Sequence, residues 1–235
     1  MGIIMDELPT FPWLAPLLQA SDSAFPTGAY AHSLGFEQIV RLGVVRDAAT
    51  LGVYLEKHLW PALIHLELPV VRFAAEAARA GDELELLALD NFVEVSRAPR
   101  ELRDASRATG RRRLHALLDS KPEPVLAAFA RAVSAGSTPG HHPVVFGAGL
   151  AALPSTAPLG AWAYQNLAAA CFAAPKLLRI GQDATRRALA AALAPVEKNI
   201  ATAMKVKRDD IGWFDPLVDL ASMQHEIAHE RLFIS

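Results

Sequence analysis

The sequence predicts an all-α protein, a single-domain helical bundle of about eight to ten helices that takes in residues 1–235. Apolar residues recur with the spacing of one helix face, for example at Leu51, Tyr54, Leu55 and Leu59. No segment shows the convincing alternation of apolar and polar residues that marks a half-buried strand. The chain also has no repeat period and no long linker, so we expect one domain rather than several.

The first strongly periodic helix has recognisable end signals. Asp47 is a typical N-cap ahead of the apolar pattern. Pro61 is expected to end or kink this helix, because proline lacks a backbone N–H. Residues 63–80 continue the helical pattern as far as Gly81, a natural C-cap.

Further helices follow along the rest of the chain. Asp82 opens one of them, and four of its residues are expected to face inward: Leu84, Leu87, Ala88 and Phe92. Pro99 starts another, which runs to about residue 118. The remaining predicted helices cover residues 122–133, 143–153, 159–174, 176–194, 195–203 and 216–231, with a loop at 135–140 and a kink at Pro175.

The composition is that of a folded protein with a substantial core. Hydrophobic residues make up 52% of the chain and charged residues 20%. The net charge of −2 argues against nucleic acid as the main ligand. The single cysteine, Cys171, excludes an internal disulfide, and its apolar neighbours favour a core residue over a nucleophile. No basic-then-apolar leader is visible at the start, so we expect a cytoplasmic protein.

Residues 143–175 contain no Asp, Glu, Lys or Arg and therefore require a membrane check. A spanning helix needs roughly 20 consecutive apolar residues. This stretch is interrupted near its middle by Pro154, Pro158 and Gly160. We therefore expect two buried core helices here and no membrane partner.

The most informative segment is residues 17–37, near the start of the chain. Ser21 and Asp22 are turn and capping residues, Pro26 fixes φ, and Gly28 frees it. Four further residues make the segment too apolar for a solvated linker: Phe25, Tyr30, Leu34 and Phe36. The segment is either a buried corner between helices or a shaped surface for a partner.

This segment resembles the N-terminal signature of the urease accessory protein F family, a Leu-Leu-Gln-x-Ser-Asp-Ser-x-x-Pro-x-Gly-x-x-x-His-Ser-x-Gly-x-Glu pattern. Three later segments resemble the same family in the expected order: 142–147, Arg179-Ile180-Gly181-Gln182, and the ending with His225-Glu226 followed by residues 231–235. The resemblance spans nearly the whole chain. It departs from the commonest pattern only at 25–27 and 29–30, where many relatives vary.

The resemblance implies an all-helical maturation factor that is not an enzyme and that acts in nickel insertion into apo-urease. Members of the family form homodimers and bind the accessory protein called D or H. That complex recruits the GTPase accessory protein G, which carries nickel, and the F protein is thought to couple the GTPase state to metal release. The implied chemistry is recognition, with no cofactor, no catalytic residue and no resident metal ligand in this chain.

The family motifs carry over to this chain residue by residue. The positions expected to have a structural role are Ser21, Asp22, Pro26, Gly28, His32, Gly35, Glu37, Arg179, Gly181 and Gln182. The positions expected to contact partners are Tyr30, His225, Glu226, Arg231, Phe233 and Ser235. In the ending, Phe233 is the expected anchor and Arg231 the charged contact, and we expect this tail to leave its apolar groups exposed on the free protein.

The segment His225-Glu226-Ile227-Ala228-His229 matches the H-E-x-x-H helix of zinc proteases. A hydrolytic zinc site needs a third protein ligand, which in common arrangements lies downstream, and only six residues follow His229. A zinc-dependent hydrolase is therefore one alternative. A self-sufficient nickel-binding chaperone is another, with ligands drawn from His32, His141, His142, His225 and His229.

Four other features have a structural interpretation and a functional one. His141 and His142 are adjacent, which makes a poor chelate and favours capping or surface positions. Arg100, Arg103, Arg107 and Arg111 form a stripe that is either a solvated face or an interface with an acidic partner. On the opposite side Leu102, Ser106, Thr109 and Leu117 are expected to pack inward, and Gly110 permits close approach of another helix. Gly181 within a helix would indicate a close contact, with Arg179 and Gln182 hydrogen-bonded. The sequence contains no complete phosphate-binding or dinucleotide-binding fingerprint, so we expect no bound nucleotide.

Overall fold

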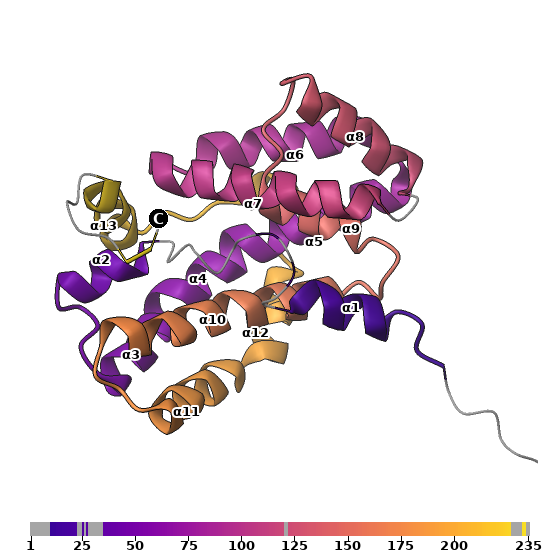
Figure 1. The fold of residues 1–235 in the computed structure, drawn as a ribbon. Coiled ribbons are helices and arrows are strands. Elements are labelled where there is room, and N and C mark those ends of the chain that lie inside the picture. Colours follow the sequence, from indigo (N-terminus) through magenta and orange to yellow (C-terminus); the bar gives the residue numbers. More distant parts are fainter. Residues whose placement is uncertain are drawn as a thin grey trace, which may run out of the picture.

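The computed structural model describes residues 10–22, 25, 27, 35–119, 122–226 and 232–233, and this part of the chain is helical with no strand (Figure 1). The all-α prediction is confirmed. The α-helical elements are α1 Leu14–Ser21, α2 Phe36–Arg41, α3 Ala48–Tyr54, α4 Trp60–Ala62, α5 Leu68–Ala80, α6 Glu83–Ser96, α7 Arg100–Leu118, α8 Pro124–Ser134, α9 His142–Gly149, α10 Ala157–Leu177, α11 Gln182–Leu193, α12 Val196–Ala203 and α13 Pro216–Glu226.

The elements α3, α4 and α5 form one continuous helix over residues 48–80. They are joined by π-helical turns at Leu55–Leu59 and Leu63–Glu67. We expected Pro61 either to end this helix or to kink it, and it does not end it. The wider π-helical turns on either side accommodate a residue that cannot donate a backbone hydrogen bond. With these three elements counted as one, the described residues hold eleven helices, close to the expected number.

Both ends of this long helix are capped as the sequence predicts. The Asp47 carboxylate accepts a hydrogen bond from the Thr50 backbone N–H at 2.8 Å, and the Thr50 hydroxyl accepts one from the Asp47 N–H at 3.0 Å. This reciprocal pair satisfies N–H groups that the first helical turn leaves without partners. At the other end Gly81 adopts a left-handed conformation with φ 71°, which glycine tolerates without strain.

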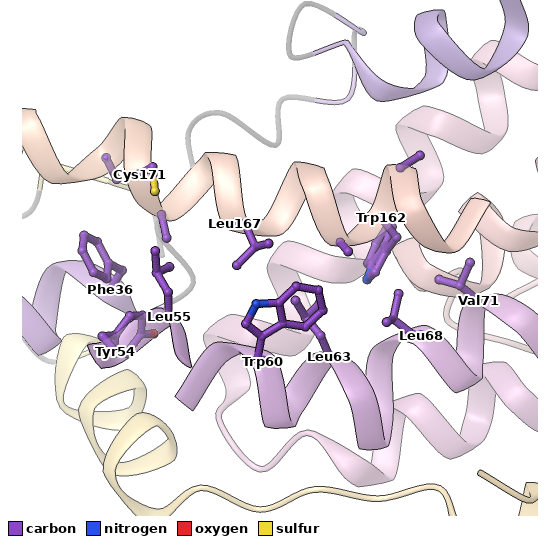
Figure 2. Close-up of a cluster of buried hydrophobic side chains, with 14 of the residues drawn as sticks. Phe36, Tyr54, Leu55, Trp60, Leu63, Leu68, Val71, Trp162, Leu167 and Cys171 are labelled. Carbon is purple, nitrogen blue, oxygen red and sulfur yellow. The ribbon is translucent and has the colours of Figure 1, made fainter. Parts of the chain in front are cut away.

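Two groups of buried side chains form the core, and the long helix contributes to both. In the first group, Trp60, Leu63 and Leu68 face Trp162 and Leu167 of α10 (Figure 2). The second group lies among α5, α6, α8 and α9. The helix that runs between the two groups therefore positions the elements on both sides of it (Figure 1).

The uncharged stretch folds as the two expected helices, α9 and α10. Cys171 lies on the buried side of α10, as predicted for a core residue, and burial raises the pKa of its thiol to about 12. None of the helices in the described part of the chain has the length and apolar character needed to cross a membrane.

The predicted inward face of α6 is correct only in part. Leu87 and Phe92 are partly buried against the second core, but Leu84 is 78% exposed and Ala88 is exposed as well. The fully buried positions are Leu86, Leu89 and Val93. The buried face also carries Asp90, which is fully buried and accepts hydrogen bonds from the loop before α9. The sequence pattern did not reveal the buried face, because a reading of hydrophobic periodicity counts every acidic residue as solvent-exposed, and Asp90 is acidic but buried.

The helix predicted at residues 176–194 is also wrong in its first part. The helix α10 continues through Pro175 and ends at Leu177, and α11 begins only at Gln182. Pro175 removes only its own backbone N–H, the donor that would reach the Cys171 carbonyl, and the helix ends two residues later at Leu177. The final predicted helix, 216–231, is described as α13 as far as Glu226.

Candidate functional site

The predicted site residues fall into two groups. Six of them lie outside the described residues: Pro26, Gly28, Tyr30, His32, Arg231 and Ser235. Of the others, residues from the N-terminal signature and from the ending meet in space around α2, α7 and α13. We call this the Glu37 site, which consists of Glu37, Arg41, Glu101, His225 and the backbone of Leu232 and Phe233.

The start of α2 positions Glu37. Gly35 occupies the N-cap position with φ 84°, a left-handed conformation that favours glycine. A Cβ atom on Gly35 would come within 2.2 Å of the Ser222 hydroxyl oxygen on α13. Gly35 therefore allows α2 and α13 to pack closely side by side (Figure 1).

The Glu37 carboxylate is 1% exposed and is the central acceptor of the site. It accepts hydrogen bonds from the backbone N–H of Leu232 at 3.0 Å and of Phe233 at 3.0 Å. It also accepts one from Arg41 on the next helical turn at 2.8 Å. Burial alone would raise the pKa of Glu37, but these donors, the His225 ring and the charge of Arg41 together hold the pKa below its ordinary value.

His225 lies between two carboxylates and has no solvent exposure. Its Nε2 is 3.3 Å from a Glu37 oxygen, and its Nδ1 is 2.8 Å from a Glu101 oxygen on α7. A neutral imidazole can donate to only one of these carboxylates, whereas a protonated ring donates to both. Next to it, Glu226 pairs with Arg100 of α7 at 3.2 Å, so α13 is tied to α7 as well as to α2.

Phe233 packs into the core of its own chain. Its side chain is 7% exposed and belongs to the first buried group, and the Lys176 ammonium lies 5.4 Å from its ring centroid. The expectation that the free protein leaves the apolar groups of its ending exposed is therefore wrong for Phe233. Of the two described residues of the ending, 232 and 233, it holds for Leu232, which is 60% exposed. The buried carboxylate of Glu37 supplies the docking point that the sequence alone did not reveal.

The geometry of His225 does not favour the zinc-protease interpretation. Both of its ring nitrogens are already within hydrogen-bonding distance of carboxylates. Within the described ranges, no group of three or more His, Cys, Asp or Glu side chains is arranged to hold a metal ion. The second histidine of the pattern, His229, lies outside these ranges.

Arg179, Ile180 and Gly181 lie in the connection between α10 and α11, and Gln182 is the first residue of α11, so the signature is not inside one continuous helix as we predicted. Arg179, Gly181 and Gln182 are exposed, and no hydrogen bond from either polar side chain occurs in the described structure. A Cβ atom on Gly181 would meet nothing within 4 Å, and its φ of −74° suits any residue. Neither a close contact nor structural hydrogen bonding accounts for this segment.

The first residues of the N-terminal signature form the C-terminal end of helix α1. Ser21 is the last residue of that helix, and its hydroxyl donates to the Leu17 carbonyl at 2.7 Å. Asp22 is the C-cap residue, and its carbonyl accepts from the Phe25 N–H at 3.1 Å. These two residues have the turn-forming role that the sequence predicts.

The arginine stripe of α7 is paired within the chain. Arg103 donates to the backbone carbonyls of Arg97 and Ala98, and Arg107 pairs with Glu94 and Asp104. Arg111 donates to the Pro139 carbonyl at 2.9 Å. On the side of α7 that was predicted to face inward, Ser106, Thr109 and Gly110 are buried, whereas Leu102 and Leu117 are only partly buried.

A second polar cluster escaped the sequence analysis. Asp90 accepts hydrogen bonds from the Thr138 hydroxyl at 2.5 Å and from the backbone N–H groups of Gly140 and His141, both at 2.6 Å. The His141 ring, 0% exposed, donates to Glu94 at 2.9 Å. Of the two positions expected for His141, the surface one is wrong, but the residue does occupy the N-cap position of α9, without a capping hydrogen bond from its side chain. Burial lowers its pKa to about 3. The only sequence signal was the acidic pair at i and i+4 on α6.

Comparisons with known proteins identify a family for this chain. The family model UreF matches residues 45–193. The chain is 33% identical over 221 residues to a urease accessory protein UreF of Arthrobacter sp. (strain FB24), covering 93% of this chain and 96% of the relative. It is 35% identical over 222 residues to the urease accessory protein UreF of Azotobacter vinelandii (strain DJ / ATCC BAA-1303), covering 93% and 97%. The all-helical fold, the four ordered signatures and these matches together show that the chain belongs to the UreF family of urease accessory proteins.

Proposed function

We propose that this chain is a non-catalytic scaffold for insertion of nickel into apo-urease. In this role it bridges the accessory protein called D or H and the GTPase accessory protein G, and it couples the GTPase state to metal delivery. The observation that carries the proposal is the match to urease accessory proteins named UreF over 93% of the chain. Residues 1–235 act as one domain in this proposal, as a homodimer in the cytoplasm.

The Glu37 site supports a recognition role for the ending. It fixes the backbone of Leu232 and Phe233 by hydrogen bonds, while the Leu232 side chain stays 60% exposed. A segment whose backbone is held and whose apolar side chain faces outward is preorganised for a partner, because less conformational entropy is lost on binding. In this arrangement Leu232 joins Tyr30, Arg231 and Ser235 as a proposed partner contact, and Phe233 acts as the internal anchor.

Glu226 and His225 support the proposed partner surface at the ending indirectly. They tie α13 to α7 and α2, and so hold the helix from which the ending departs. Their proposed contribution to partner binding is to orient this surface.

The test is recovery of partners by the tagged chain from cells that express the urease operon, together with urease activation in a strain that lacks the chain. Leu232→Ala should keep the melting temperature, since Leu232 enters the Glu37 site only through its backbone. It should weaken recovery of protein D/H and of the GTPase. Leu84→Ala, at another exposed leucine (78%) on α6, is the matched control and should change neither.

Two results would contradict the proposal in different ways. Full partner recovery by Leu232→Ala would remove the ending from the docking surface and leave the scaffold role intact. Normal nickel loading of urease in the strain lacking the chain would overturn the scaffold role itself.

A further inference from the structure

A cavity of about 800 Å³ lies among α1, the long helix, α7, α10 and α13. Its wall is mostly apolar, with contributions from Leu17, Leu63, Ala161 and Phe172. Cavities of this size and character commonly hold small ligands, with a few placed polar groups fixing their orientation. The polar groups of this wall therefore indicate what could bind.

The charged group at one end of the cavity is Arg113 of α7, which is 2% exposed. Its Nε is 3.1 Å from the His142 ring, and its Nη2 donates to the Ala20 carbonyl at 3.1 Å. The guanidinium also lies over the rings of Phe25 at 4.3 Å and Phe146 at 4.8 Å.

Arg113 has no carboxylate partner among the described residues. No ion pair joins it to an acidic side chain, and nothing described accepts a hydrogen bond from its Nη1. A buried cation without a counter-charge is costly, since buried charges in proteins are normally paired. Burial accordingly lowers the pKa of Arg113 to about 10, and no neighbouring carboxylate opposes that shift.

The groups around Arg113 in the described structure do not neutralise its charge. Burial, together with the charges of Arg113 and Arg97, holds the pKa of His142 well below its ordinary value, so its ring is neutral. Two acids, Asp22 and Glu67, also line the cavity. Glu67 is paired with Arg97 at 2.6 Å, and no ion pair joins Asp22 to Arg113 in the described structure. Trp162, labelled in Figure 2, has an indole N–H that is buried without a hydrogen-bond acceptor.

The opposite end of the cavity is acidic. Asp215 and Asp219 lie there, with the His58 ring 2.7 Å from Asp215. Along the long helix, His58 and Glu67 are separated by nine residues, or about 14 Å at 1.5 Å per residue. An elongated anionic ligand would therefore be oriented, with its negative group toward Arg113 and away from the two aspartates.

We propose that this cavity binds an apolar carboxylate, whose carboxylate group pairs with the Arg113 guanidinium while its apolar body lies along the long helix and α10. A small aliphatic acid and the free C-terminus of an apolar peptide share this chemistry. A carboxylate would give Arg113 the counter-charge that the chain lacks. This inference is independent of the scaffold role, because it concerns the isolated chain.

The test uses isothermal titration of the purified chain with two matched pairs of probes. One pair is octanoate and octanamide, and the other is acetyl-Ala-Leu-Leu-Ala as free acid and as C-terminal amide. In at least one pair the acid should bind about tenfold or more tightly than its neutral partner, as expected for a hydrogen-bonded charge pair. The pair that shows the preference identifies the source of the carboxylate.

Variants locate the binding. Arg113→Met should abolish the preference for the acid, whereas Arg186→Gln, at an arginine whose side chain is 72% exposed, should preserve it. Ala169→Trp, at an exposed position on the cavity wall, should weaken acid and amide alike. Because it leaves Arg113 in place, Ala169→Trp keeps the test decisive if Arg113→Met does not fold.

The proposal is overturned if neither acid binds more tightly than its neutral partner. It is also overturned if a preference exists but is unchanged in Arg113→Met. Where Arg113→Met does not fold, it is overturned if Ala169→Trp binds the acid and the amide as tightly as the wild type does. Either result would leave Arg113 as a structural link between α7 and the end of α1.

Discussion

Replacing Glu37 by alanine should release the ending of the chain while leaving the helices folded. The carboxylate accepts two backbone hydrogen bonds, from Leu232 and Phe233, at 3.0 Å each. Hydrogen bonds to a charged group contribute about 1.5–3 kcal/mol each, so losing both costs roughly 3 kcal/mol or more. The Arg41 ion pair adds little, because the Arg41 side chain is 37% exposed and its charge is screened by solvent.

The assay is amide hydrogen exchange at Leu232 and Phe233. A loss of roughly 3 kcal/mol corresponds to exchange about a hundredfold faster, up to the rate of an unprotected amide. Glu37→Gln should give a smaller acceleration, near tenfold, because hydrogen bonds to a neutral acceptor are about half as strong. Glu76→Ala removes another carboxylate with an arginine one turn away and should change neither amide.

The same site predicts a dependence on pH. The pKa of Glu37 is held below its ordinary value of 4.5, so its ionised form contributes stability that is fully present above that value. This contribution is lost as the pH falls through the lowered pKa, and exchange at both amides should then accelerate in the wild type. Wild-type exchange rates in a folded Glu37→Ala variant at neutral pH would refute the reasoning.

The remaining predictions concern packing and reactivity. Gly110→Ala should destabilise the protein by about 1–3 kcal/mol, because its Cβ would lie 2.1 Å from the Gly140 carbonyl oxygen. Gly52→Ala, whose Cβ meets nothing within 4 Å, should instead stabilise helix α3 by up to about 1 kcal/mol. Midpoints of urea unfolding equal to that of the wild type in the two variants would contradict both predictions. Asp90→Ala should cost about 3 kcal/mol in urea unfolding, since it leaves two loop N–H groups buried without an acceptor, and a cost under about 1 kcal/mol would contradict this. Cys171 should resist a thiol reagent at pH 8 until the chain unfolds, because it is buried and its pKa is raised to about 12; rapid modification of the folded protein would show that α10 opens.

Local signals predicted much of the fold. The cap at Asp47, the C-cap at Gly81 and the helix beginning after Pro99 all rest on interactions between residues close in sequence. Such signals are readable without tertiary structure. The two helices of the uncharged stretch were predicted for a similar reason, since prolines and small polar residues separate them.

The incorrect predictions share one physical cause, because they depend on tertiary contacts that cannot be recognised in the local sequence. Asp90 faces the core because a loop 48 residues further on supplies Thr138 as a donor. Phe233 is buried because Glu37, 196 residues away, accepts its backbone N–H. In both cases a buried carboxylate reverses what polarity alone indicates, and only the folded chain shows the donors that compensate it.

The two π turns of the long helix have a consequence for how this fold tolerates change in length. Each π turn holds one residue more than an α-helical turn, so it absorbs a single inserted residue and leaves the helix faces on either side in the same relative orientation. The C-terminal half of the helix directs Val70 and Ala74 to the second core, while Leu68 and Val71 still serve the first. Removing one residue between 63 and 67 should therefore restore an ordinary α-helical turn there and leave Val70 and Ala74 facing the second core. The side-chain register of this one helix thus orients residues toward both core groups at once.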